Sequence, residues 1–364
     1  MALFGPPDVA ALKGKRDVQG LIKALAYTGD PAVRRAAAAA LAELGDVRAV
    51  EPLCLALRRS DWGEHEWQDT SVVADALVRF GAPAVGPLIA TLEWHSKVVR
   101  VSVAGALAAI GRPAVQPLIA LLGDSDLENR ETASVILTDI GADAVDPLID
   151  ALHDELIGRR QRAARILGDI GDERAVEALV GSLRDSLAGV RQAGARSLGQ
   201  IADVRALDYL AAILKDTDPA VRRAAALALA EMHDPRGVET LLPELRGQKP
   251  QPVLNALVNV GVPAVEPLVT MLAGSVARGD AAWLVDELRS DLAKVLAAIG
   301  YPQAVAGLVL QLFVEDAAER IRAAAELVRL RRSDGLDDQA KALIRFAAPV
   351  IDQALADDAA AGAA

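Results

Sequence analysis

The sequence has few aromatic residues, a single cysteine and no excess of basic charge, and each shortage excludes a class of protein. Aromatic residues make up 3% of the 364 residues although 52% are hydrophobic, so alanine, leucine and valine must build the core. Cys54 is the only cysteine, which excludes a disulfide framework and a cysteine-based metal site within one chain. The formal net charge of −11 argues against DNA or RNA as the main ligand, because nucleic-acid binding draws on basic surface.

Signals for membranes and for common catalytic sites are also missing. No window is both long and uncharged enough to span a bilayer. The N-terminus, MALFGPPDVAALKGKRD, lacks a basic start followed by an apolar run, so we predict no secretory signal and a cytoplasmic location. The sequence contains no glycine-rich phosphate loop of the G-x-x-x-x-G-K-[ST] type and no evident nucleophile–base pair. These absences favour a non-enzymatic protein without a cofactor.

The sequence instead repeats one helical hairpin many times. In residues 30–57, Asp30 is the predicted N-cap of a first helix, Pro31 is its first residue and Gly45 ends it. A second, shorter helix follows from Val47 to Leu57. The same glycine recurs at 30-residue intervals, at positions 81, 111, 141 and 171. Because one hairpin cannot bury its own apolar face, this period predicts a solenoid of stacked repeats.

The repeated patterns D-P-x-V-R-x-x-A-x-x-A-L-x-x-L/I-G and A-V-x-P-L-I-x-x-L resemble HEAT repeats. More narrowly, they resemble the short repeats of phycobilisome-lyase-like (PBS lyase) proteins, over roughly residues 17–330. The resemblance implies an all-α fold: a right-handed α-solenoid, or superhelix, of about ten HEAT-like hairpins. The predicted organisation is an N-terminal cap at 1–16, the repeat array at 17–330, a capping helix at 331–355 and a disordered tail at 356–364.

A tryptophan- and histidine-rich edge is the first candidate site. The interval from Gly45 to Gly81 is six residues longer than the 30-residue intervals that follow it, and the excess falls in residues 58–71. Five aromatic and imidazole side chains belong to this insertion or to the equivalent turn of the next repeat: Trp62, His65, Trp67, Trp94 and His95. Tryptophan is enriched at binding hot spots, which favours a partner site. The alternative is that the rings fill space under the longer loop. The spacing of histidine and carboxylate residues predicts no metal site.

Two charged series run through the repeats. An arginine recurs on the first helices, and it is predicted to tie neighbouring repeats together through a carbonyl group or an aspartate such as Asp46, Asp172 or Asp203. We call the second series the acidic row: Glu51, Asp146, Glu177, Asp208 and Glu239, near the start of the second helices. In HEAT-like arrays the second helices line the concave face, so the resemblance places the row there. It is either a solvated face that complements the helix dipoles or a surface for a basic partner.

The predicted function is a non-enzymatic scaffold that binds another protein through the concave face and the edge of residues 58–95. The acidic row would supply charge complementary to a basic partner surface. One alternative, suggested by the repeat subtype, is a phycobilin lyase-type protein or another subunit that handles a chromophore or small ligand. A third interpretation is self-association through a poorly capped end of the array. Neither nucleic acid nor a membrane is an expected partner.

Overall fold

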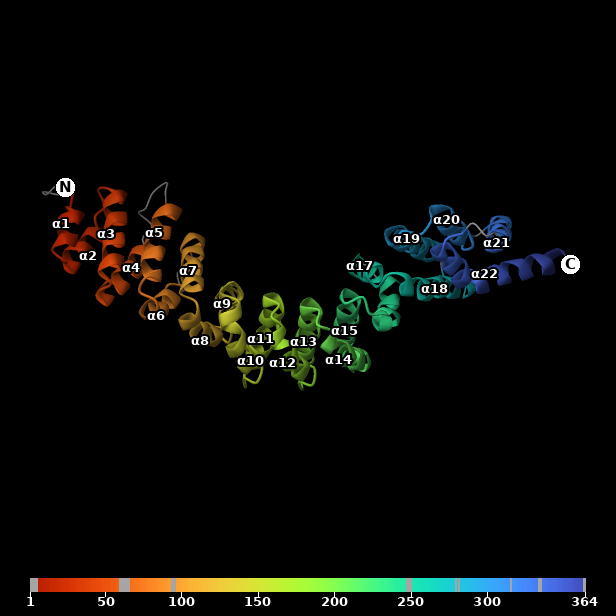
Figure 1. Cartoon of the computed structure of the whole chain (residues 1–364), viewed down its shortest axis with the longest axis horizontal. Coiled ribbons are helices and arrows are strands. Elements are labelled where there is room, and N and C mark those ends of the chain that lie inside the picture. Colours follow the sequence, from red (N-terminus) through yellow and green to blue (C-terminus); the bar gives the residue numbers. More distant parts are fainter. Residues whose placement is uncertain are drawn as a thin grey trace. The chain divides into compact units, whose positions relative to one another are not determined.

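The computed structural model describes residues 6–58, 66–92, 96–246, 251–278, 280, 282–314, 316–332 and 336–362. These ranges contain helices and short connections and no strand, which confirms the predicted all-α solenoid. The chain divides into two compact units, Met1–Ser182 and Leu183–Ala364 (Figure 1). The division falls inside the predicted array of residues 17–330, and the predicted domain boundaries stay predictions. No helix among the described ranges combines the length and the apolar character that a membrane crossing needs.

The first unit alternates first helices with second helices. After α1, the second helices are the even-numbered ones from α2 to α12 and the first helices are the odd-numbered ones from α3 to α11. First helices contact first helices and second helices contact second helices along the unit, which makes two layers. The bounds are α1 Val9–Gly14, α2 Val18–Leu25, α3 Pro31–Leu44, α4 Val50–Leu57, α5 Glu66–Val78, α6 Ala82–Thr91, α7 Lys97–Ile110, α8 Arg112–Leu121, α9 Leu127–Ile140, α10 Ala142–Ala151, α11 Ile157–Ile170 and α12 Val176–Ser182.

The second unit begins with the same alternation and ends differently. Its last helix, α22, packs against both α18 and α20. It continues to Gly362, through most of the segment predicted as a disordered tail, and the alanines there have high helix propensity. The bounds are α13 Ala188–Ile201, α14 Leu207–Ala212, α15 Pro219–Glu231, α16 Val238–Leu241, α17 Gln251–Val260, α18 Val265–Ala277, α19 Ala282–Ile299, α20 Gln303–Gln311, α21 Ala317–Arg331 and α22 Asp338–Gly362.

Local sequence signals explain where the first helices begin and end. The Asp30 carboxylate accepts a hydrogen bond from the Ala32 amide at 2.8 Å, and Gly45 ends the helix in the left-handed conformation with φ of 68°. The predicted stop glycines all have positive φ. Ala202 and His233 occupy the same position in their repeats and adopt φ of 56° and 60° without glycine. The repeat geometry therefore sets this conformation even where the residue disfavours it.

In several repeats the recurring arginine ties the turn before a first helix to that helix, whereas Arg100 on α7 bonds to Asn129 and Glu128 of α9. Arg130 donates from Nη1 to the carbonyl oxygens of Asp124 and Ser125, at 2.7 and 2.8 Å. Arg160, Arg191, Arg222 and Arg320 make the equivalent bond to a carbonyl six residues earlier. These carbonyl groups lie in the arginine's own turn, and Arg191 also pairs with Asp216, an aspartate of the next repeat. The three aspartates named as candidates, Asp46, Asp172 and Asp203, each pair instead with an arginine two residues later in their own turn.

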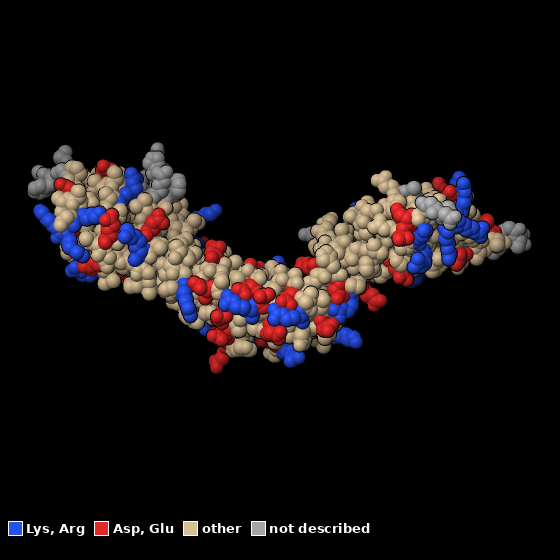
Figure 2. Space-filling view, in the orientation of Figure 1, with Lys and Arg blue, Asp and Glu red and all other residues tan. Residues whose placement is uncertain are grey.

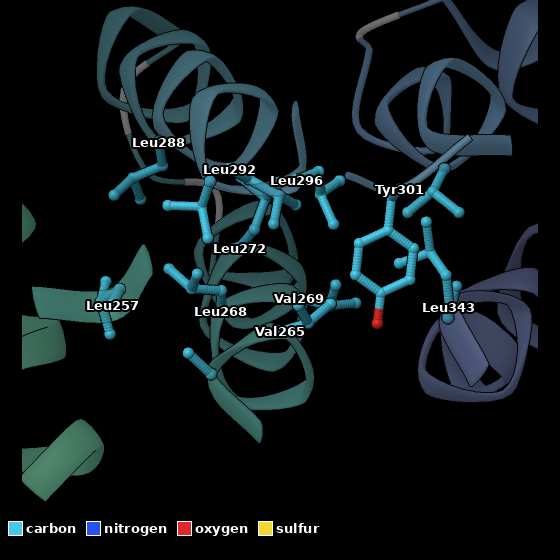
Figure 3. Close-up of a cluster of buried hydrophobic side chains, with 14 of the residues drawn as sticks. Leu257, Val265, Leu268, Val269, Leu272, Leu288, Leu292, Leu296, Tyr301 and Leu343 are labelled. Atoms are coloured by element: carbon cyan, nitrogen blue, oxygen red, sulfur yellow. The ribbon is translucent and has the colours of Figure 1, made fainter. Parts of the chain in front are cut away.

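A hydrophobic core cluster of the second unit runs from α15 to α22 and is built mainly of leucine, valine and alanine side chains (Figure 3). Tyr301 lies within it beside Leu343 and is 3% exposed. Its hydroxyl has no hydrogen-bond partner among the described residues, and burial raises the pKa of the phenol.

We expect Tyr301→Phe to keep or raise the melting temperature, with a gain of up to about 1 kcal/mol. Phenylalanine preserves the packing and removes a buried polar atom that has lost its water. Thermal unfolding followed by circular dichroism measures this, with Tyr209→Phe as the exposed control, since Tyr209 is 43% exposed. A clear loss of stability in Tyr301→Phe alone would mean that the hydroxyl is hydrogen-bonded after all.

Candidate interaction surface

The tryptophan- and histidine-rich edge lies almost entirely outside the described residues. Trp62 and His65 fall in the gap at 59–65, and Trp94 and His95 fall in the gap at 93–95. Trp67 belongs to α5, and its side chain is outside the described part of the structure. The binding role of these five residues stays a prediction.

The acidic row is described in full and is exposed throughout. Glu51, Glu177 and Glu239 are the acidic residues in the first turns of α4, α12 and α16. The side chains of Asp146 on α10 and Asp208 on α14 are 77% and 92% exposed. All five side chains of the row therefore face solvent on the second helices.

Arginines stand beside part of the row, and the sequence reasoning missed them. Arg174 Nη1 lies 3.4 Å from Asp146 Oδ1 in the first unit. Arg236 Nη1 lies 2.8 Å from Asp208 Oδ1 in the second unit. Each arginine comes from the next repeat, 28 residues later. The row is therefore partly neutralised, and acidic and basic side chains are interspersed on the repeats around α9–α12 (Figure 2).

A D-x-R turn holds these arginines in place. Asp172 accepts from the backbone amide of Arg174 at 2.9 Å and from its guanidinium at 2.8 Å, and Asp234 accepts in the same way from Arg236 at 3.0 and 2.7 Å. The side-chain hydrogen bond from Arg205 lowers the pKa of Asp203, in the same turn of another repeat, to about 2. The motif recurs at 46–48, 172–174, 203–205 and 234–236, which is a signal that the sequence alone could have offered.

Two residues of the acidic row, Glu51 and Glu239, have no arginine in the adjacent turn of the next repeat. A groove with mainly apolar walls lies near each of them. The turns after Glu51 and Glu239 in the next repeat are G-A-P at 81–83 and G-V-P at 261–263. Beside Glu51, α2 and α4 enclose a cavity of about 380 Å³ lined by six apolar residues: Ile22, Leu25, Ala26, Pro52, Leu55 and Ala56. Glu239 itself lines a cavity of about 370 Å³ with Pro243, Met271 and Arg278. The first groove is wholly apolar and is lined by Pro52, the residue after Glu51, whereas the second contains a carboxylate and a guanidinium among apolar walls.

Reactive groups do not gather in the part of the chain that the structure describes. Burial raises the pKa of the Cys54 thiol to about 12, so this thiol is protonated at neutral pH and is a poor nucleophile. Within the described ranges, no three His, Cys, Asp or Glu side chains are placed to hold a metal ion. His233 sits at a helix end, where its Nδ1 lies 2.5 Å from the Asn259 carbonyl oxygen.

Comparisons with known proteins agree with the architecture. The profile of the HEAT repeats family matches residues 115–193 and 185–260, and that of the PBS lyase HEAT-like repeat matches 33–59 and 99–124. No curated protein matches the chain. The complex of CpcE and CpcF of phycocyanin lyase from Nostoc sp. PCC7120 is 25% identical over 41% of this chain and 98% of that chain, with a TM-score of 0.35. An engineered protein is 22% identical over 92% of this chain and 99% of that chain, with a TM-score of 0.37. A Kap121p mutant is 14% identical over 96% of this chain and 43% of that chain, with a TM-score of 0.49.

Proposed function

Because the chain is a HEAT-repeat protein that includes repeats of the PBS lyase HEAT-like type, we propose that it is a non-enzymatic scaffold that binds another protein in the cytoplasm. The observation that carries the proposal is the exposed acidic row on the second helices, with apolar grooves beside Glu51 and Glu239. The partner is a protein with a basic surface. The edge of residues 58–95 is a proposed second contact, through its tryptophans and histidines.

Charge and apolar surface have separate roles in this interface. Rim carboxylates attract a basic partner and raise the association rate, and this effect weakens with salt. The apolar grooves supply most of the lasting affinity, because buried apolar area outweighs exposed ion pairs. The arginines beside Asp146 and Asp208 then restrict where a basic partner is accepted, since they repel its cations at those repeats.

We expect a row variant, Glu51→Gln/Asp146→Asn/Glu177→Gln, to bind the partner about tenfold more weakly at low salt, because three attractive charges are lost. The partner is captured from lysate by wild-type protein and identified by mass spectrometry. Its affinity for wild type and variant is then measured by titration at several salt concentrations. A second variant, Asp208→Asn/Glu239→Gln, tests the row in the other unit.

The matched control neutralises three exposed carboxylates on the first helices: Asp75, Asp139 and Asp169. It changes the net charge by the same amount on the other layer. Equal weakening by the control and by the row variant would show that only the net charge matters, and it would contradict the proposed surface. Capture of no protein by wild type would contradict the scaffold itself.

The match to the PBS lyase HEAT-like repeat supports one alternative, a subunit that handles a bilin or another small ligand. Mixing the protein with a free bilin and recording its absorbance spectrum separates the two functions. A shifted and saturable spectrum, lost in Trp62→Ala/Trp67→Ala/Trp94→Ala, would favour the ligand-handling role over the scaffold.

A further inference from the structure

A groove in the second unit is lined by an unusual set of uncharged amide side chains. It lies between the first helices α17 and α19, which are in contact, and it encloses about 530 Å³. The chain has three asparagines, and two of them, Asn255 and Asn259, line this groove together with Gln251. All three amide residues are exposed. We call the cavity with these three residues the amide groove.

Packing within the repeat does not account for the amides. Gln251 Nε2 donates to Asn255 Oδ1 at 2.8 Å. The Asn255 NH₂ group and the Asn259 side chain have no hydrogen-bond partner in the part of the chain that the structure describes. Asparagine also has a lower helix propensity than alanine, leucine or lysine. Two asparagines therefore weaken α17, and their hydrogen-bonding groups stay available to a partner.

The amide groove combines an apolar floor with the absence of net charge. Leu254 and Val295 line it and are 4% and 0% exposed. The helix α17, with the sequence QPVLNALVNV, has no charged residue. Lys294 is the one charged residue among the described residues that line the groove, and its Nζ lies 2.8 Å from Asp291 Oδ1. A charged occupant would lose water without gaining an unmatched opposite charge, so the groove favours a neutral occupant that forms hydrogen bonds.

The spacing of the amides fits an extended peptide backbone. A four-residue step along an α-helix advances about 6 Å, and every second residue of an extended chain repeats at about 6.6–6.8 Å. A segment that lies along α17 can therefore present successive backbone groups to Gln251, Asn255 and Asn259. Each side-chain amide offers both a donor and an acceptor, as each peptide unit does. The mismatch over the three amides is about 1–2 Å, which rotation of the side chains can absorb.

We propose that the amide groove binds an extended, uncharged segment of a partner protein through the backbone of that segment. Small apolar side chains of the segment alternate with its backbone contacts and pack on Leu254 and Val295. The proposal rests on the proposed function as a protein-binding scaffold. It adds a site on the first helices of the second unit, in the other layer from the acidic row.

Selective labelling of asparagine with nitrogen-15 tests the site, because the three asparagines give three pairs of side-chain NMR signals. The probe is the uncharged peptide acetyl-Thr-Val-Thr-Val-Thr-amide, whose β-branched residues favour an extended backbone. We expect a saturable shift of the Asn255 and Asn259 signals. The Asn129 signals should stay in place, because Asn129 is 8% exposed and accepts a hydrogen bond from Arg100 in the first unit.

The variant Asn255→Ala/Asn259→Ala separates binding from folding. Alanine has the higher helix propensity, so the melting temperature is expected to stay the same or to rise. A fluorescein-labelled copy of the peptide, titrated by fluorescence anisotropy, should bind the variant about tenfold more weakly because two hydrogen bonds are lost. Asn255→Gln/Asn259→Gln keeps the amides and should recover most of the affinity. The matched control is Gln192→Ala, which removes an exposed amide from α13 and should bind like wild type.

A second peptide, N-methylated at both valines, separates backbone recognition from apolar contact. It lacks two backbone donors and should bind about tenfold more weakly than its parent. Equal affinities of the two peptides, equal affinities of the alanine variant and the Gln192→Ala control, or no binding by wild type would overturn the proposal. A shift of the same two signals by maltose and not by the peptide would also overturn it, in favour of a neutral saccharide. If the row variant loses the captured partner and wild type does not bind the peptide, the scaffold function stands and the amide groove fails.

Discussion

Replacing Arg191 by alanine is expected to lower the free energy of unfolding by about 2–4 kcal/mol, because the change leaves a largely buried carboxylate without its cation. Arg191 Nε and Nη2 each lie 2.8 Å from an oxygen of Asp216, and the two side chains are only 14% and 10% exposed. The same guanidinium donates from Nη1 to the carbonyl oxygens of Asp185 and Ser186. One side chain therefore ties its own turn to the next repeat of the second unit.

The size of this loss should depend on pH. Hydrogen bonding from Arg191 is the main reason that the pKa of Asp216 lies below its ordinary value of 3.8. A carboxyl group with a lowered pKa stabilises the fold fully above its unfolded pKa, and this contribution disappears as the pH falls through the lowered value. The difference between wild type and Arg191→Ala should thus be constant above about pH 5 and shrink as the pH falls through the lowered pKa of Asp216.

Urea unfolding followed by circular dichroism at pH 7, 5 and 3 measures both effects. Arg48→Ala is the control, because Arg48 pairs with Asp46 on the surface, where its side chain is 63% exposed, and exposed pairs contribute little. Arg191→Lys keeps the charge but cannot reproduce the two parallel hydrogen bonds, so it should lie between wild type and Arg191→Ala. If Arg191→Ala lowered the free energy of unfolding as little as Arg48→Ala does, the Arg191–Asp216 pair would not contribute significantly to the stability of the second unit.

Gly237→Ala is expected to destabilise the second unit by about 1–3 kcal/mol through a backbone clash. An ideal Cβ atom at this position would lie 2.7 Å from the carbonyl oxygen of Ala226 and 2.8 Å from its Cα. Both atoms belong to the backbone of α15, which cannot rotate away as a side chain could. Gly237 has φ of −82°, so the glycine is required by close approach and not by its own conformation.

Destabilisation by Gly237→Ala would be the opposite of what a comparison of the repeats predicts. The equivalent residue after each D-x-R turn elsewhere is alanine, at positions 49, 175 and 206, so a consensus argument predicts that Gly237→Ala stabilises the protein. The control is Gly105→Ala in the middle of α7, where a Cβ atom would meet nothing within 4 Å. That change should raise stability by about 0.5–1 kcal/mol. Thermal melts of the two variants should move in opposite directions, and a shared gain would contradict the clash.

The candidate surface was predicted only in part. The acidic row follows from spacing, since Glu51, Asp146 and Asp208 each hold the same place in a repeat. The arginines beside Asp146 and Asp208 were missed because the pairing joins residues 28 apart in sequence. The tryptophans and histidines of the predicted edge stay untested.

The sequence by itself determined the helices, their ends and the repeating hairpin. These features depend on local chemistry: an aspartate that caps the first turn, as at Asp30, and a residue with positive φ that ends the helix, as at Gly45. The tertiary structure decided which groups meet across repeats. Arg191 has Asp216 as its partner, and Gly237 has no room for a methyl group, because the distance between stacked helices is set by all of their side chains together. A pattern within one repeat carries no information about that distance.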